Sequence, residues 1–218
     1  MVRAICFDLD DTLYPYEQYA HAGLRAAAAH LEAEAGVDVA DDLVAAYDAG
    51  IRGGTFDHVL ERRGLSKEHV PDLVAAFHDR IGALEPYSGV PRLLERLGTE
   101  RRLGLITDGR NGRAKLAELG LESAFDAVWV SPERGVTKRD PEPFEETLAI
   151  LGAEPTDAVY VGDHPTVDVA VPKALGMETV RLRQGRYADE SGPEPDAVLE
   201  SVGELPAVLE EPTSRPRK

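Results

Sequence analysis

The sequence predicts an α/β protein with a doubly wound parallel sheet and a helical domain inserted after the first strand. Three observations lead to this fold class. Residues 2–7 form a short apolar run of strand length, whereas residues 14–86 carry helical patterns and no convincing strand pattern. From residue 87 onward, short apolar runs alternate with segments of helical periodicity. Polar residues follow several of these runs, at the strand ends where such sheets bind ligands.

The first predicted strand ends in a group of acidic residues. The apolar run Val2–Phe7 is followed by Asp8, Asp10, Asp11 and Thr12. Because side chains alternate along a strand, we expect Asp8 and Asp10 to point the same way. Two such carboxylates repel each other unless a cation lies between them, and Mg²⁺ prefers carboxylate, phosphate and water oxygens. For this segment alone, the alternative is a solvated acidic turn.

The insertion is predicted to be a bundle of four short amphipathic helices. The predicted helices cover residues 23–35 and 42–51, a segment capped by Thr55, and a segment from Ser66 to residue 81. Pro15 and Pro86 are the expected hinges. We therefore predict an α/β core of residues 1–13 and 87–210, an inserted helical domain of residues 14–86, and a disordered tail at residues 211–218.

The rest of the chain predicts the alternating elements of the core. A helix begins near Pro91 and closes at Gly98, with proline at a first-turn position that suits it. The predicted strands that follow are residues 102–106, 127–130, 158–161, 179–182 and 197–199. The predicted helices between them are residues 113–120, 141–151 and 166–175.

Composition excludes several classes of partner. Hydrophobic residues make up 43% of the chain, so we expect a globular protein. The net charge of −16 argues against nucleic acid or an anionic membrane surface as a partner. The lone cysteine, Cys6, lies inside the first strand and is predicted to be a buried structural thiol. With no signal-peptide character and no apolar run of membrane-spanning length, the expected location is the cytoplasm.

Four further polar residues follow later strands, in or beside the expected ligand crevice. They are Thr107, Lys138, Asp163 and Asp168. Each alone has a common structural explanation as a helix cap, a solvated charge or a turn residue. Their occurrence in this order around one edge of a sheet indicates a single site.

Together these segments resemble the four motifs of the haloacid dehalogenase-like (HAD) hydrolase superfamily. The matching segments are Phe7–Thr12, Ile106–Gly109, Lys138 with Asp140–Phe144, and Val161–Asp168. The set in this order is highly specific, although no single member is. The resemblance implies a Rossmann-like core and a phosphatase branch with a small helical cap, which the inserted domain would provide.

The resemblance also implies a role for each residue. Asp8 would attack phosphorus to give an aspartyl-phosphate, and Asp10 would protonate the leaving alcohol and then activate water. Thr107 and the backbone N–H of Asp108 would hold a phosphoryl oxygen, and Lys138 would offset negative charge.

The implied cofactor is Mg²⁺. Its implied ligands are Asp8, the backbone carbonyl of Asp10, and Asp163, with Asp168 binding it directly or supporting its ligands.

The expected function is hydrolysis of a small phosphorylated metabolite by a Mg²⁺-dependent phosphatase. Dehalogenation is disfavoured because such members lack the second aspartate, which is Asp10 here. A phosphonate hydrolase would need a Schiff-base lysine in the cap, where the only lysine, Lys67, fits a solvated charge better. A phosphomutase shares every core residue and stays an alternative. A receiver-like signalling domain and a non-catalytic phosphate-binding protein are the alternatives of another class.

Residues of the cap are candidates for substrate recognition. Arg52 lies in the glycine-containing link between two cap helices, where we expect it either to contact substrate or to be solvated. Tyr14 and Tyr16, just past the first motif, are expected either to line the entrance or to pack at the hinge. Sugar phosphates, phosphoglycolate and nucleoside monophosphates are the candidate substrates. We make no prediction of oligomeric state.

Overall fold

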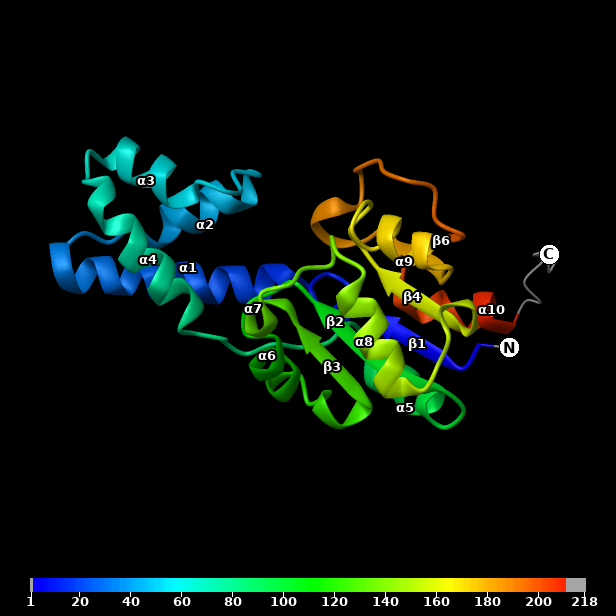
Figure 1. Cartoon of the computed structure of the whole chain (residues 1–218). Coiled ribbons are helices and arrows are strands. Elements are labelled where there is room, and N and C mark those ends of the chain that lie inside the picture. The colour runs from blue at the N-terminus through cyan, green and yellow to red at the C-terminus, as the bar shows by residue number, and fades with distance from the viewer. Residues whose placement is uncertain (1, 211–218) are drawn as a thin grey trace. The chain divides into compact units, whose positions relative to one another are not determined.

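The computed structural model describes residues 2–210, which form two compact units (Figure 1). One unit comprises the described parts of Met1–Pro15 and Glu85–Lys218, and the other comprises Tyr16–Leu84. The predicted tail at residues 211–218 lies outside the described residues. The two units are described separately below, and the role of the second as a cap stays a prediction.

The first unit is built on a six-stranded, fully parallel sheet in the order β3-β2-β1-β4-β5-β6. Its strands are β1 (Ala4–Phe7), β2 (Arg102–Thr107), β3 (Ala127–Val130), β4 (Ala158–Gly162), β5 (Glu178–Leu182) and β6 (Ala197–Leu199). The strand order reverses direction between β1 and β4, and ligands bind at such a switch point. The predicted doubly wound parallel sheet is therefore confirmed.

Strand register brings the functional strand ends to one edge of the sheet. Phe7, the last residue of β1, pairs with Leu105 of β2 and with Val161 of β4. All four residues of β1 are buried, as expected for a central parallel strand covered on both faces. Cys6 is among them, and burial raises the pKa of its thiol to about 12, which fits the predicted structural role.

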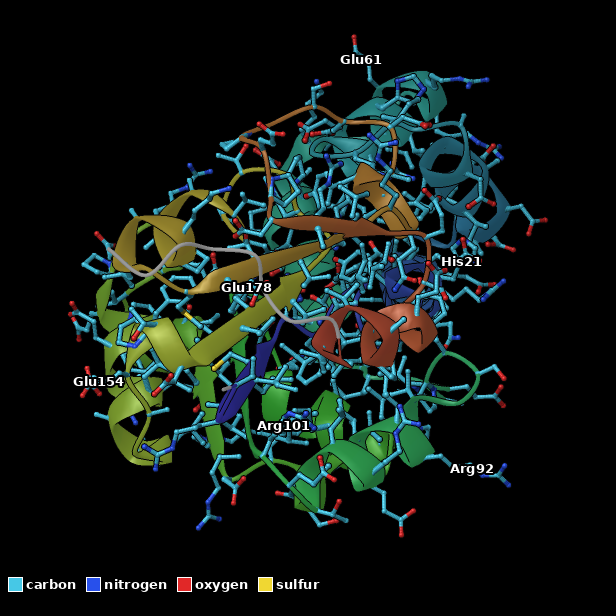
Figure 2. The ribbon with its side chains drawn as sticks, turned by 90° about the vertical axis from the view of Figure 1, so that its right-hand side faces the viewer. His21, Glu61, Arg92, Arg101, Glu154 and Glu178 are labelled. Carbon is cyan, nitrogen blue, oxygen red and sulfur yellow. The ribbon has the colours of Figure 1, made fainter. Side chains whose placement is uncertain are left out.

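Helices cover both faces of this sheet (Figure 1). They are α5 (Val90–Gly98), α6 (Gly112–Glu118), α7 (Ser131–Arg134), α8 (Glu142–Leu151), α9 (Ala170–Leu175) and α10 (Leu205–Glu210). α8 packs on β2 and β3, where Phe144 contacts Tyr160 edge-on in an apolar cluster. Charged side chains such as Arg92 and Glu154 extend away from the ribbon (Figure 2).

α9 is shorter than predicted, because residues 165–169 form turns. The expected helix began at Thr166, but the structure begins it at Ala170. The side chain of Asp168 accepts a hydrogen bond from the backbone N–H of His164, at 2.9 Å. This local hydrogen bond competes with helix formation and fixes the position of Asp168.

The second unit is a four-helix bundle, as its sequence pattern predicts. Its helices are α1 (Tyr16–Ala35), α2 (Ala40–Asp48), α3 (Thr55–Arg63) and α4 (Val70–His78). Their apolar faces meet in one buried cluster that includes Leu24, Leu31, Leu43, Leu60 and Leu73.

Several boundaries in the bundle differ from the prediction, including that of α2, which covers Ala40–Asp48 and not residues 42–51. α1 begins at Tyr16 directly after Pro15, because Tyr19 and Ala20 extend its buried face. Thr55 is not a side-chain cap: its hydroxyl donates to the Ile51 carbonyl at 2.7 Å. The predicted last helix is a short 3₁₀ turn followed by α4, which ends at His78.

Among residues 2–210, no helix is both long enough and apolar enough to cross a membrane.

Candidate active site

Three sheet strands deliver the predicted site residues to one edge of the first unit. Asp8 follows β1, Thr107 ends β2, and Asp163 follows β4. All three are at most 5% exposed, although two of them are carboxylates. A carboxylate is buried at such a position only if charge or hydrogen bonds compensate it. The surroundings of these residues therefore identify the chemistry of the site.

Lys138 lies among the carboxylates at this edge. Its ammonium group is 2.6 Å from Asp8 Oδ1 and 2.7 Å from Asp168 Oδ1, and its side chain is almost fully buried. Burial alone would lower the pKa of Lys138, but Asp168 and Asp8 raise it well above its usual value. Lys138 is therefore a fixed positive charge beside Asp8.

Asp8, Asp163 and Asp168 form a buried three-carboxylate group. One oxygen from each lies within 4.8 Å of the others. One oxygen of Asp163, Oδ2, is buried and has no hydrogen-bond partner among residues 2–210. An orphaned carboxylate oxygen facing two further carboxylates fits a hard divalent cation. A second His/Asp/Glu group, in the other unit, is partly or fully exposed and fits such an ion less well, since water competes there.

Burial and mutual repulsion also raise the pKa values of these acids. Burial, opposed in part by Lys138 and assisted by Asp168 and Asp10, raises the pKa of Asp8 to about 7. Burial, followed by the charges of Asp8 and Asp168, also raises the pKa of Asp163 well above its usual value. Without a cation the group therefore favours protonated carboxyls.

The loop after β2 is held by hydrogen bonds that leave backbone groups in fixed places. The hydroxyl of Thr107 accepts from the Gly109 N–H at 3.1 Å. Asp108 Oδ1 accepts from the Ser131 hydroxyl at 2.5 Å and from the Lys138 backbone N–H at 3.0 Å. Asp108 thus ties the loop after β2 to the loop that carries Lys138.

Asp10 lies outside the three-carboxylate group. Its carboxylate contacts the ammonium of Lys115, at 2.8 Å to Oδ1 and 3.0 Å to Oδ2, and accepts from the Tyr14 hydroxyl at 2.6 Å. Its charge still raises the pKa of Asp8. The predicted metal contact of Asp10 is its backbone carbonyl, and that contact stays a prediction.

Lys115 is the site residue that the sequence analysis missed. It lies on α6 and is 1% exposed. The available signal is its spacing: Lys115 and the buried Leu119 are four residues apart, which puts a lysine on the apolar face of a helix. Tyr14 is fully buried and its hydroxyl donates to Asp10, so of the two alternatives expected for this residue the structure supports packing.

Arg52 belongs to the second unit, where its guanidinium lies 5.2 Å from the ring centre of Tyr47. This exposed side chain therefore has a partner within the bundle. Tyr16 also packs there, beside Tyr19 and the apolar cluster of the bundle. Contact of Arg52 with substrate stays a prediction.

Comparison with known proteins places this geometry in a family. The haloacid dehalogenase-like hydrolase family matches residues 2–176. This match covers most of the chain, including all four motifs. The chain belongs to the haloacid dehalogenase-like hydrolase family. The predicted family is thereby confirmed, together with its Rossmann-like fold.

Individual family members resemble the chain over most of their length. A glyceraldehyde 3-phosphate phosphatase of Methanopyrus kandleri is 36% identical over 87% of each chain. A ribulose-1,5-bisphosphate 5-phosphatase of Halopiger xanaduensis is 34% identical over 87% of this chain and 88% of its own. The crystal structure of a 2-haloacid dehalogenase from Pseudomonas syringae superposes with a TM-score of 0.70 at 27% identity, over 96% and 98% of the two chains.

Proposed function

We propose that this HAD-family hydrolase is a Mg²⁺-dependent phosphatase that transfers the phosphoryl group of a small sugar phosphate to Asp8 and then to water. The observation that carries the proposal is the buried group at the β1–β4 edge. There Asp8, Asp163 and Asp168 converge, Lys138 bridges two of them, and Asp163 keeps one oxygen without a partner in residues 2–210.

The enzyme class follows from the family. The predicted class, a phosphoric monoester hydrolase, is confirmed by the family match and by relatives named as phosphatases. The Pseudomonas dehalogenase shares the fold at 27% identity, against 36% and 34% for the two phosphatases named above. The second aspartate, Asp10, favours the phosphatase branch, because departure of a halide needs no proton donor.

The charge of the site supports Mg²⁺ as the cofactor. Three carboxylates, those of Asp8, Asp163 and Asp168, are at most 5% exposed, and the ammonium group of Lys138 compensates one of them. Two negative charges remain, which one divalent cation balances. Asp8, Asp163 and the backbone carbonyl of Asp10 would hold the ion, with Asp168 supporting them. When bound, Mg²⁺ neutralises charge on the phosphoryl oxygens and orients them.

In the first step, a carboxylate oxygen of Asp8 attacks phosphorus, and the bond from phosphorus to the leaving oxygen breaks. Lys138, held 2.6 Å from Asp8 Oδ1, offsets the negative charge gathered by nucleophile and phosphate. Asp10 enters this step protonated and gives that proton to the departing alcohol. The products are the free alcohol and a phosphorylated Asp8.

In the second step, Asp10 takes a proton from water, and the resulting hydroxide attacks phosphorus. The bond from phosphorus to Asp8 breaks, which frees inorganic phosphate and restores the carboxylate. Thr107 and the backbone N–H of Asp108 hold a phosphoryl oxygen in both steps. The hydrogen bonds from Ser131 and Lys138 to Asp108 keep that loop in place.

The names of the relatives suggest the substrate. Two of them act on phosphorylated sugars, namely glyceraldehyde 3-phosphate and ribulose 1,5-bisphosphate. We propose a small sugar phosphate, with glyceraldehyde 3-phosphate as the first compound to test. Arg52 of the predicted cap is our candidate for contact with the sugar end.

Phosphate release tests this function. We would measure it from glyceraldehyde 3-phosphate, ribulose 1,5-bisphosphate, phosphoglycolate, a nucleoside monophosphate and an aryl phosphate, with Mg²⁺ or with a chelator. The wild type is expected to need Mg²⁺ and to prefer the triose phosphate. Asp8→Asn is expected to lower kcat/KM by about a thousandfold or more, since it removes the nucleophile.

Asp41→Asn is the matched control, because it changes an exposed aspartate of α2 in the same way and is expected to keep wild-type activity. Release that persists in chelator, or in Asp8→Asn, would contradict the proposal. Conversion of a substrate to its isomer without phosphate release would support the phosphomutase alternative. A long-lived phosphoenzyme without turnover, or phosphate binding alone, would support the receiver-like or binding alternatives.

A further inference from the structure

Two buried side chains that the mechanism above does not use surround the carboxylate of Asp10. Lys115 Nζ is 2.8 Å from Oδ1 and 3.0 Å from Oδ2, so the ammonium contacts both oxygens. The Tyr14 hydroxyl donates to Oδ1 at 2.6 Å. Lys115 is 1% exposed and Tyr14 is fully buried. The three contacts hold both carboxylate oxygens.

A third element confines the same carboxylate. Gly109 follows β2, and a Cβ atom built at this glycine would lie 2.4 Å from Asp10 Oδ2. That separation is far inside van der Waals contact, so the backbone of the loop approaches Asp10 as closely as a glycine allows. The Gly109 N–H also donates to Thr107, whose hydroxyl is a candidate phosphate contact. Asp10 therefore lies between α6, Tyr14 and the phosphate-binding loop.

Simple stabilisation is a poor explanation for this arrangement. Burying a lysine ammonium is costly, and a buried ion pair is often no more stable than apolar residues of the same volume. α6 could pack with an apolar residue at position 115, as it does at Leu116. The lysine instead meets the carboxylate to which the mechanism assigns both proton transfers. Proton transfer depends on the position of the donor within hydrogen-bond distance of its target.

We propose that Lys115 and Tyr14 are positioning residues, which hold the Asp10 carboxyl where it serves the leaving group. The proposal rests on the proposed function, because it gives Asp10 its role there. Neither residue contacts the phosphate in this account; both act through Asp10. Their loss should therefore matter only where the reaction needs Asp10.

Substrates with different leaving groups distinguish a positioning role from a purely structural role. Departure of a sugar alkoxide needs a proton, whereas a nitrophenolate is stable without one. In a two-step mechanism through a phosphoenzyme, kcat/KM reports the reaction only as far as loss of the leaving group. Misplacing Asp10 should therefore lower kcat/KM for a sugar phosphate and change it little for nitrophenyl phosphate.

The test compares kcat/KM of Lys115→Met on the best sugar phosphate and on nitrophenyl phosphate. Because general acid catalysis contributes about 100- to 10,000-fold, we expect a loss of about 10- to 100-fold on the sugar phosphate and of less than about threefold on nitrophenyl phosphate. Lys173→Met is the matched control, since it removes a lysine of α9 that pairs with Asp196 at 3.3 Å, and it should leave both values unchanged.

A double-mutant cycle tests whether Lys115 acts through Asp10. In an Asp10→Asn background, adding Lys115→Met should cause no further loss on the sugar phosphate. Equal losses on both substrates, or losses that multiply with those of Asp10→Asn, would overturn the proposal.

Tyr14→Phe provides a second test if Lys115→Met does not fold. It removes one hydroxyl and keeps the ring, and it should give a smaller loss with the same dependence on the leaving group. A loss that is equal on both substrates would overturn the proposal. If the wild type hydrolyses no phosphate ester, the proposed function is overturned, and the positioning role with it. If the wild type is active but the variants lose activity equally on both substrates, only the positioning role is overturned.

Discussion

Asp8 and Asp163 are carboxylates in a site with fewer cations than acids. Burial first, and then neighbouring charges, raises the pKa of Asp8 from 3.8 to about 7 and that of Asp163 in the same direction. An acid whose pKa is higher in the folded than in the unfolded state binds more protons when folded. Its stabilising effect is complete below the unfolded value and is lost as the pH rises through the folded one.

We therefore predict that the metal-free protein loses stability between about pH 4 and about pH 8, and that Mg²⁺ restores it at the upper end. The measurement is the melting temperature across this range, with chelator or with Mg²⁺. In Asp163→Asn, the melting temperature of the metal-free protein should fall less steeply with pH, and Mg²⁺ should raise it less, because the substitution removes one of the titrating ligands. Asp41→Asn should keep the wild-type slope; a slope that is the same in all three proteins would contradict the account.

At the scale of elements, the loop after β5 is bound to the loop that carries the nucleophile. Arg186 Nε donates to Asp11 Oδ2 at 2.5 Å, and the Gln184 side chain donates to the carbonyls of Asp11 and Thr12 at 2.8 and 3.1 Å. Asp11 has a φ of +59°, which non-glycine residues seldom adopt. These contacts stabilise a strained turn three residues beyond Asp8.

Gly185 makes this contact between loops possible. Its φ is +69°, and a Cβ atom there would lie 2.3 Å from Asp11. We predict that Gly185→Ala lowers stability by about 2–4 kcal/mol, combining backbone strain with overpacking, and lowers kcat by displacing the Asp8 loop. Gly152→Ala is the matched control, because its φ is +64° with no atom within 4 Å of the added Cβ.

Gly152→Ala should therefore cost only about 1–2 kcal/mol and spare kcat. Urea unfolding and kcat measurements check both variants. Equal effects of the two substitutions would show that the contact with Asp11 has no importance of its own.

At the scale of the whole molecule, the sequence could predict the positions of residues that lie at the ends of the parallel strands. The carboxyl ends of β1, β2 and β4 meet at one edge, so Asp8, Thr107 and Asp163 could be placed together from strand patterns alone. The role of Lys138 required the motif resemblance, since it lies in a loop. The four-residue helix α7 was missed because it is too short to show a helical period.

The partners of Asp10 and Asp11 could not be predicted in the same way. Lys115 lies 105 residues from Asp10, and Arg186 lies 175 residues from Asp11. Neither pair has a motif, and each cation sits in a segment of ordinary helix or loop composition. Only the folded arrangement shows that a buried lysine and a partly buried arginine match these two acids.

The central claim is that the phosphoryl group passes through Asp8. The most direct measurement is an acid-quenched reaction with a radiolabelled sugar phosphate and Mg²⁺, followed by identification of the labelled peptide. We predict label on the peptide that carries Asp8 in the wild type, and none on it in Asp8→Asn. Rapid release of phosphate with no label on that peptide at any time, or label on another residue, would contradict the mechanism.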